Sequence, residues 1–238
     1  MKKFLYIFYI GILLVVASCS PSSPSGYSRY GVFPETDEVT VGETALDSVY
    51  FRYPYRMEIG NGLAVLLDLH NDSHYLYAFT YPDWQPVAPF GKRGEGPEEL
   101  LSADRVRLCA PDSVWVLDAN RMQITRWSVD VANRQVSRVE TVSLDKRLLR
   151  TLDFCKTANG FLVDDYTGEH RFHEIGIDGR IIRSMGTVPT EDEGKRENPM
   201  ALAQAWRSFM DYDPQGGTLA IATQLGEVLE IHNLKTGF

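Results

Sequence analysis

Three aspartates recur at similar places along the chain and are the residues best suited to hold a cation. Asp68, Asp118 and Asp164 (or its neighbour Asp165) each follow a short apolar run and precede a polar turn. Ca²⁺ needs about six to eight oxygen ligands around one point, and carboxylates are suitable donors. Alternatively, each carboxylate accepts backbone N–H bonds and stabilises only its own turn. The spacing of the aspartates is compatible with both interpretations.

Other groups that could do chemistry are sparse. His170 and His173 lie three residues apart beside Glu169, but in a strand residues i and i+3 point to opposite faces, so the spacing does not favour chelation. The zinc, EF-hand and nucleophile-elbow motifs are absent from the sequence. We therefore assign no catalytic residue and no cofactor-binding residue. Cys109 and Cys155 are expected either as buried thiols or as a bridge between neighbouring repeats.

A glycine-rich stretch, FGKRGEGPEEL from Phe90 to Leu100, has part of the spacing of a phosphate-binding loop. Gly91 and Gly96 match the two glycines of that motif, but Pro97 and Glu98 stand where lysine and serine or threonine are needed. Without the lysine, the main contact to phosphate is lost. We therefore interpret the stretch as a crossing between two structural units, where glycine permits a positive φ.

The N-terminus predicts export. Two lysines precede an uncharged apolar run from Phe4 to Ala17, as in a signal peptide. The tetrapeptide Val-Ala-Ser-Cys that ends at Cys19 resembles a bacterial lipobox, which implies a lipoprotein signal peptide over residues 1–18 and lipid attachment at Cys19. The Ser- and Pro-rich residues that follow predict a flexible tether over residues 19–34.

These features predict a protein of the bacterial cell envelope that a lipid anchor holds to a membrane, most simply the outer membrane. The net charge is −8, and no block of basic residues appears in the sequence. Nucleic acid is therefore not an expected partner. The membrane is the expected partner through the anchor, and a protein, a peptide or a glycan is the expected class of ligand.

The body of the chain, residues 35–238, reads as repeated β-structure. Apolar strands begin at Leu63, Val114, Phe161 and Thr218, roughly 50 residues apart, and a polar turn and a second apolar strand follow each of them. Several strands per unit at this period predict an all-β fold, a β-propeller. About four units fit into the chain, and the repeat breaks off near residue 238, so we expect a partial propeller that is incomplete at the C-terminus.

A resemblance to known families supports this interpretation. The stretch from Phe90 to Trp127, which contains FGKRGEGPEEL and VWVLDANRMQITRW, resembles an NHL-type repeat. The stretch from Leu202 to Gly237 is similar to six-bladed TolB-like propeller lipoproteins of Bacteroidetes. The resemblance implies a six-bladed architecture, of which this chain supplies part. It implies no particular ligand.

One helix and one aromatic strand interrupt the pattern. Asn198 can cap a helix that Pro199 starts, so we predict a short inserted helix over Asn198–Phe209. Alternating aromatic residues from Tyr75 to Tyr81 share one face of a strand, either to bind a ligand or to fill the space between blades.

We expect a binding or scaffold module with its ligand at the axial mouth or on the inserted helix. The alternative is a metal-dependent, lactonase-like hydrolase. It would hold Ca²⁺ through Asp68, Asp118 and Asp164 at the axis.

Overall fold

The computed structural model describes Glu35, Asp37, Glu38, Thr40, Gly42 and residues 49–110, 112–189 and 198–235. The predicted signal peptide, Cys19 and the tether lie outside these residues, as does the charged segment 190–197. The chain divides into two units, residues 1–43 and residues 44–238, and the fold described below is that of the second. None of the helices in the described part has the length and apolar character needed to span a membrane.

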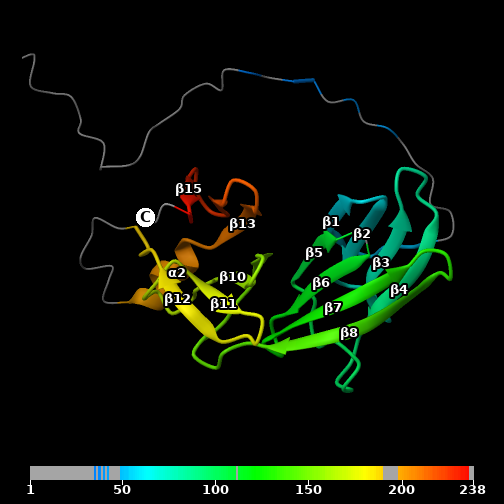
Figure 1. The fold of residues 1–238 in the computed structure, drawn as a ribbon, viewed down its shortest axis with the longest axis horizontal. Coiled ribbons are helices and arrows are strands. Elements are labelled where there is room, and N and C mark those ends of the chain that lie inside the picture. Colours follow the sequence, from blue (N-terminus) through cyan, green and yellow to red (C-terminus); the bar gives the residue numbers. More distant parts are fainter. Residues whose placement is uncertain are drawn as a thin grey trace, which may run out of the picture. The chain divides into compact units, whose positions relative to one another are not determined.

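Four antiparallel sheets follow one another along the second unit and form the blades of a propeller (Figure 1). Blade 1 contains β1 (Pro54–Gly60), β2 (Leu63–Asp68), β3 (His74–Thr80) and β4 (Pro86–Lys92). Blade 2 contains β5 (Arg105–Ala110), β6 (Ser113–Asp118), β7 (Gln123–Asp130) and β8 (Gln135–Ser143). Blade 3 contains β9 (Phe154–Lys156), β10 (Gly160–Asp164), β11 (Phe172–Gly176) and β12 (Ile181–Met185). Blade 4 contains β13 (Ser208–Asp213), β14 (Thr218–Thr223) and β15 (Leu229–Asn233).

The predicted repeat is confirmed. Leu63, Val114, Phe161 and Thr218 are each the first or second residue of the second strand in successive blades, namely β2, β6, β10 and β14. Each of these strands pairs with the innermost strand of its blade on one side and with the third strand on the other. In the described residues the fold is therefore all-β, a partial six-bladed propeller of four blades with one short inserted helix.

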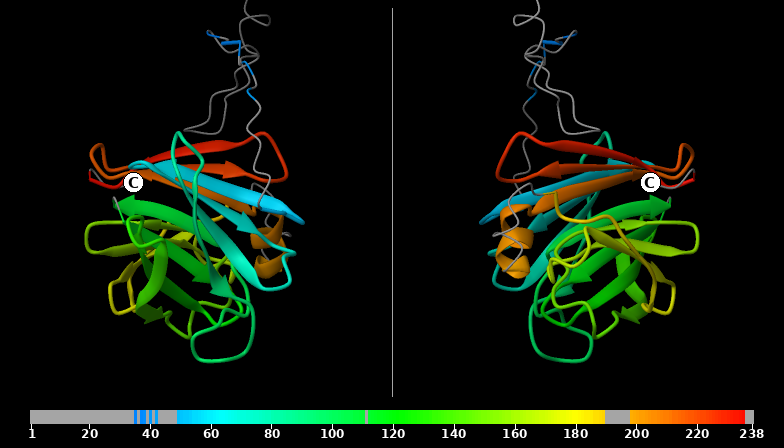
Figure 2. Two further views of the ribbon diagram at one scale, coloured as in Figure 1. Left: turned by 90° about the vertical axis from the view of Figure 1, so that its right-hand side faces the viewer. Right: turned by 90° about the vertical axis from the view of Figure 1, so that its left-hand side faces the viewer.

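Large side chains fill the wedges between neighbouring blades. Trp127 of blade 2 contacts Phe90 of blade 1, with ring centroids 5.4 Å apart, and Trp115 contacts Phe161 of blade 3 at 5.1 Å. Phe161 is fully buried, and burying a side chain of this size contributes about 1.5–3 kcal/mol. Sheets that are apolar on both faces must stack on neighbours, and Figure 2 shows the resulting twisted layers.

The glycine-rich stretch joins the outer strand of blade 1 to the inner strand of blade 2, as predicted for a crossing. Gly91 has φ +64°, and a Cβ there would lie 2.7 Å from the Leu76 side chain, so only glycine fits. Arg121 of blade 2 holds this glycine-rich stretch in place, because its Nη2 donates to the Gly96 carbonyl at 2.9 Å.

The inserted helix is shorter than predicted. Helix α2 spans Pro199–Ala205, and the Asn198 side chain caps it by accepting from Ala201 N at 3.1 Å. The predicted extension to Phe209 is wrong, because Ser208 and Phe209 begin β13. Pairing with β14 overrides helix propensity there, and the Gln224 N–H already donates to the Arg207 carbonyl at 2.7 Å.

The two cysteines of the blades do not form a disulfide in this structure. Cys155 on β9 is buried and Cys109 on β5 is exposed, and both thiols are free. Burial raises the pKa of the Cys155 thiol to about 12, so this group is protonated at neutral pH and packs as a small apolar side chain.

Candidate functional site

The strand-end aspartates act as caps within their own blades. Asp68 ends β2 and is fully buried; its carboxylate accepts from Arg52 N at 2.8 Å and from Tyr53 N at 2.7 Å. Asp118 ends β6 in the same way and accepts from Leu101 N at 2.8 Å and from Arg121 N at 3.0 Å. These bonds hold the segment that leads into each innermost strand, which is the turn-stabilising role considered from the sequence.

Asp164 occupies the same position in blade 3, but a second carboxylate, that of Asp153, lies nearby. Its Oδ1 accepts from Leu152 N at 2.9 Å and from Asp153 N at 3.2 Å, while its Oδ2 is buried without a hydrogen-bond partner among the described residues. Burial, reinforced by the charge of nearby Asp153, raises the pKa of Asp164 from 3.8 to about 7. Asp164 is therefore largely protonated below neutral pH.

The structure does not bring the three aspartates together as a ligand set. Each ends the second strand of a different blade, and each is bonded to backbone donors of its own blade. In the part of the chain that the structure describes, no group of three or more His, Cys, Asp or Glu residues could hold a metal ion.

The histidine pair is arranged differently from the sequence expectation. The rings of His170 and His173 lie 5.6 Å apart, because His170 belongs to the turn before β11 and not to the strand. His173 Nδ1 lies 2.9 Å from Ser184 Oγ on the paired strand, and its Nε2 lies 3.5 Å from Asp165 Oδ2. Asp165 also accepts from Thr167 and His170; although burial opposes it, these bonds lower the pKa of Asp165 to about 2.

A different set of charges meets where the innermost strands approach one another. Asp153, just before β9, is 2% exposed and forms ion pairs with two arginines of β5. Its Oδ1 lies 2.9 Å from Arg105 Nε and 3.3 Å from Arg107 Nη2. Its Oδ2 accepts from Met210 N of β13 at 3.0 Å. A buried carboxylate with this many partners satisfies its lone pairs, as a buried charge must.

Arg107 connects all four innermost strands. Its Nε donates to the Phe154 carbonyl of β9 at 2.9 Å, and its Nη2 donates to the Met210 carbonyl of β13. Its Nη1 lies 3.7 Å from Glu58 of β1 and 3.3 Å from Asp211 of β13. Burial raises the pKa of Glu58, and the positive charge of Arg107 opposes that rise. We call these residues the axial network: Glu58, Arg105, Arg107, Asp153 and Asp211.

The sequence analysis missed the axial network, although a signal for it exists. In the strand register, Glu58, Arg107, Lys156 and Asp211 pair with equivalent residues of the second strands. These innermost strands carry charged residues at alternate positions, as in RVRLC from Arg105, where a half-buried strand would have apolar ones. Charge at alternate positions of each first strand could have identified the axis.

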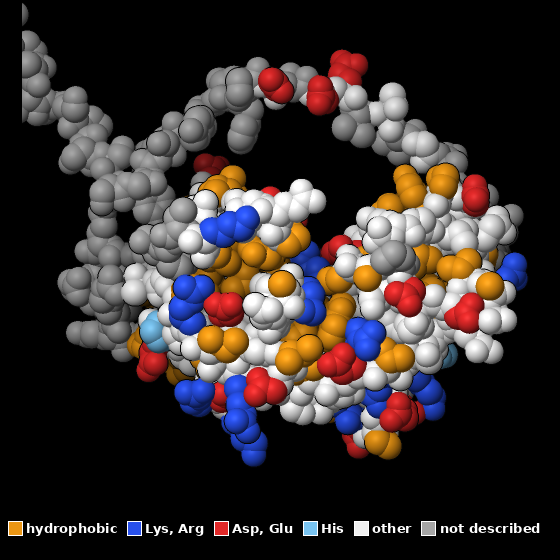
Figure 3. Space-filling model, viewed as in Figure 1, with side chains coloured by type: hydrophobic (Ala, Val, Ile, Leu, Met, Phe, Trp, Pro, Cys, Tyr) orange, Lys and Arg blue, Asp and Glu red, His pale blue; other side chains and the backbone are white. Residues whose placement is uncertain are grey.

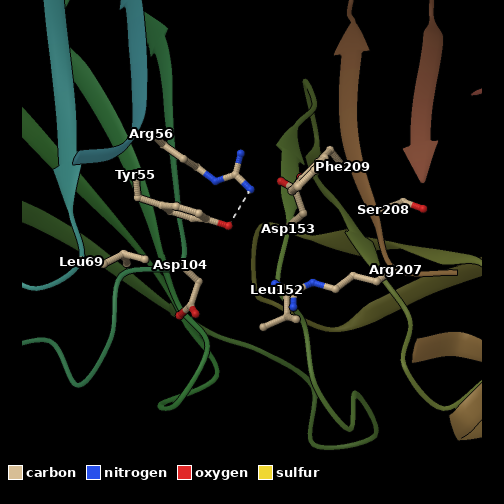
Figure 4. Close-up of a pocket in the computed structure, with 9 residues that line it drawn as sticks. All are labelled: Tyr55, Arg56, Leu69, Asp104, Leu152, Asp153, Arg207, Ser208 and Phe209. Atoms are coloured by element: carbon tan, nitrogen blue, oxygen red, sulfur yellow. Dashed lines mark hydrogen bonds between the residues drawn. The ribbon is translucent and has the colours of Figure 1, made fainter. Parts of the chain in front are cut away.

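A cavity of about 120 Å³ opens beside the axial network, between blades 1 and 4. Figure 3 shows the face hollowed where these two blades oppose each other, and Figure 4 shows the lining side chains. These come from all four blades and the segments that lead into them: Tyr55, Arg56, Leu69, Asp104, Leu152, Asp153, Arg207, Ser208 and Phe209.

Two arginines of this axial cavity have no carboxylate partner among the residues that the structure describes. The Arg56 guanidinium lies 4.7 Å from the ring centroids of both Tyr55 and Phe209 and donates to Tyr55 Oη at 3.4 Å. Its Nε is buried and has no hydrogen-bond partner within the described ranges. The Arg207 side chain likewise makes no hydrogen bond or ion pair to any described residue.

Tyr77 and Phe79 of β3 contact aromatic residues from the segments before and after their blade strands. Phe51 lies edge-on to Tyr77 and Phe79, with ring centroids 5.4 and 6.2 Å apart, and Trp84 lies 6.2 Å from Phe79. A shallow apolar hollow beside them is lined by Tyr50, Tyr77 and Phe79, among others. Trp115 and Trp127, by contrast, fill the wedges between blades. This is the space-filling role that the sequence analysis considered for aromatic residues.

Comparison with solved structures finds similar proteins at low identity. A putative 6-phosphogluconolactonase from Bacteroides uniformis ATCC 8492 is 13% identical with a TM-score of 0.49 over 78% of this chain and 55% of that chain. A protein from Lactobacillus plantarum is 11% identical (TM-score 0.45; 78% and 53% covered). A DUF4221 family member from Bacteroides vulgatus is 9% identical (TM-score 0.46; 79% and 59% covered).

The chain therefore spans between 53% and 59% of the length of these three structures. No match was found among curated proteins. A family model described as TolB-like 6-blade propeller-like matches residues 33–238, most of the chain and the whole of the bladed unit. The chain belongs to the TolB-like six-bladed propeller family.

Proposed function

We propose that this protein is a lipid-anchored binding module of the bacterial cell envelope, with its ligand at the axial cavity. The observation that carries the proposal is that cavity, in which Arg56 and Arg207 have no carboxylate partner in the described part of the chain. A concave site that contains polar groups without partners in the fold is the default candidate for a ligand-binding site. The strand-end aspartates, by contrast, have their bonds within the fold.

The position of the cavity agrees with this role. It lies where innermost strands of a propeller meet, and the segment after α2 supplies Arg207, Ser208 and Phe209 to its wall. The segment that follows α2, and not α2 itself, therefore contributes to the cavity wall. A metal-dependent hydrolase would need converging carboxylates, and Asp68, Asp118 and Asp164 instead cap separate blades.

Lipidation is tested on Cys19. Cells that express the full chain are fed a palmitate analogue, and the protein is examined for the label and for its distribution between membrane and soluble fractions. We expect the native chain to carry the label and to sediment with membranes. We expect Cys19→Ser to lose the label, because serine does not supply the thiol that the lipobox resemblance assigns to lipid. A label that persists in Cys19→Ser overturns the anchor.

Ligand binding is tested by filling the cavity. The full chain in detergent is incubated with a small-molecule extract of bacterial envelopes and washed, and retained compounds are identified by mass spectrometry. Phe209→Trp keeps an aromatic ring against Arg56 but reduces the space beside it. We expect this variant to lose a compound that the native chain retains.

The matched control for this experiment is Tyr50→Trp. Tyr50 is 79% exposed and lies on the outward face of blade 1, away from the axial cavity. This variant should retain the same compound as the native chain. Equal retention by Phe209→Trp and the native chain would place the ligand elsewhere and contradict the proposal.

A further inference from the structure

We propose that the axial cavity recognises the oxyanion head group of a small ligand, a carboxylate or a phosphate, between Arg56 and Arg207. This inference rests on the proposed function and adds the chemical class of the ligand. Three observations support it. The two guanidinium groups have no carboxylate partner among the described residues, the cavity is small, and the acidic groups in its wall are bonded to other residues.

Arg56 is held in place without being neutralised. Two aromatic rings, Tyr55 and Phe209, contact its guanidinium at 4.7 Å each, so its plane is fixed by stacking. Its Nε is buried and makes no hydrogen bond to any described residue. A guanidinium presents five donors in a rigid fork that suits carboxylate and phosphate oxygens. The structure therefore holds a donor fork in an orientation ready for an anion.

Arg207 approaches the same cavity from the other side. It precedes β13 in blade 4, whereas Arg56 lies on β1 in blade 1. Figure 4 shows both side chains extending from opposite blades toward the space between them. Two positive groups in one cavity repel each other, and a bound anion relieves that repulsion while it accepts from both.

The acidic residues of the wall do not cancel these charges, because they bond to other groups. Asp153 is paired with Arg105 and Arg107. Asp104 Oδ2 accepts from Ser102 Oγ at 2.6 Å and from Ala119 N at 3.0 Å. The cavity thus contains two basic groups with free donors and two acidic groups that the fold already uses.

The volume limits what enters. A cavity of about 120 Å³ is slightly smaller than an apolar cavity of ~150 Å³ that admits benzene. A carboxylate or phosphate group with a few neighbouring atoms fits within it, and a folded partner does not. The remainder of a larger ligand would extend through the opening between blades 1 and 4.

The test measures anion binding by the full chain in detergent at constant ionic strength. Acetate and inorganic phosphate are the probes, acetamide is the neutral counterpart of acetate, and binding is followed by the NMR shifts of the arginine Nε–H groups. We expect saturable binding of at least one anion and none of acetamide. Tighter binding of acetate assigns a carboxylate ligand, tighter binding of phosphate assigns a phosphate ligand, and equal binding assigns the shared oxyanion chemistry.

Charge-removing variants locate the site. Arg56→Gln and Arg207→Gln should each weaken anion binding about tenfold, and the double variant should abolish it. Arg183→Gln is the matched control, because Arg183 on the outer strand β12 is half exposed and pairs with Glu174 at 3.0 Å; this variant should bind as the native chain does. Unchanged thermal midpoints show that the variants fold.

Two results overturn the inference: no binding of either anion, or binding that both cavity variants leave intact. The retention experiment separates this failure from failure of the proposed function. If Phe209→Trp loses the retained compound while Arg56→Gln and Arg207→Gln keep it, the cavity binds a ligand that is not an oxyanion. If none of the three variants affects retention, the cavity is not the binding site at all.

Discussion

The strand-end aspartates and the two arginines of the axial cavity, Arg56 and Arg207, are two sets of charged residues with opposite surroundings. Asp68 and Asp118 recur in the sequence at the period of the blades and accept backbone N–H bonds within their own blades. Arg56 occupies on β1 the position that Arg105 occupies on β5, since each pairs with the residue before a strand-end aspartate. Among the described residues, however, neither Arg56 nor Arg207 has a carboxylate partner. The strand-end aspartates maintain the fold, and these two arginines are available to a ligand.

Within each set, the burial and the partners of a residue decide its pKa and its contribution to stability. Arg105 and Arg107 lie in the same strand register as their counterparts in β1 but are buried against Asp153. Asp164 ends β10 as Asp118 ends β6, and burial together with the charge of Asp153 raises the pKa of Asp164 to about 7. Substitutions at equivalent positions of the repeat should therefore have unequal effects, because the surroundings of these positions differ.

The largest effect is expected at the axis. Asp153→Ala removes the shared partner of Arg105 and Arg107 and also an acceptor for Met210 N. Breaking a buried ion pair by removing one partner costs about 3–5 kcal/mol, because the other charge stays buried without compensation. Urea unfolding of the full chain should report a loss of this size.

The matched control is an exposed ion pair. Asp72 lies 2.5 Å from Arg52, but its side chain is 81% exposed, so Asp72→Ala should change the free energy of unfolding by less than about 1 kcal/mol. If the two alanine variants lost similar stability, the axial network would contribute no more than a surface pair, and the contrast drawn above would fail.

A smaller effect is expected from Asp118→Asn. The Asp118 carboxylate accepts from Leu101 N through Oδ2 and from Arg121 N through Oδ1, and an amide offers one acceptor oxygen where the carboxylate offers two. Loss of a buried acceptor leaves donors unsatisfied and costs about 1–3 kcal/mol. The comparison variant is Asp164→Asn in the next blade, and both are measured by urea unfolding.

At acidic pH, where Asp164 is protonated, the smallest effect is expected from Asp164→Asn, and this effect should change with pH. Because the pKa of Asp164 is raised, the folded state still binds a proton between pH ~4 and pH ~7, whereas the unfolded state has already released it. Stability from this group therefore falls as pH rises through that window, by up to about 1.4 kcal/mol per unit, and is constant above it. Asparagine retains an acceptor for Leu152 N and Asp153 N and does not titrate.

The stability difference between the native chain and Asp164→Asn should accordingly move in favour of the variant from pH 5 to pH 7.5. A parallel pH profile for the native chain and Asp164→Asn would mean that Asp164 is ionised throughout, like an ordinary surface carboxylate.

The blades were predictable from the sequence because their signals are local. Apolar strand starts such as Leu63 and Val114 recur with turn residues after them, and Asn198 followed by Pro199 marks a helix start without tertiary information. The end of the helix was predicted wrongly because strand pairing of Ser208 and Phe209 decides it. That pairing depends on residues that come later in the chain.

The candidate site was not predictable in the same way because its contacts are long-range. Arg107 reaches the Met210 carbonyl across 103 positions of sequence, and only the curvature of the stacked blades brings them together. Sequence placed Asp68, Asp118 and Asp164 at equivalent strand ends correctly. It could not distinguish convergence on an axis from capping of separate turns, since both give the same spacing.

The reach of Arg107 has a consequence for how the blades unfold. In most repeat proteins each unit contacts only its neighbours, so terminal units open before central ones. Here one guanidinium bonds to the first, third and fourth blades from the second. Hydrogen exchange at the innermost strands should therefore slow to a common rate, with all four blades opening together as one cooperative unit.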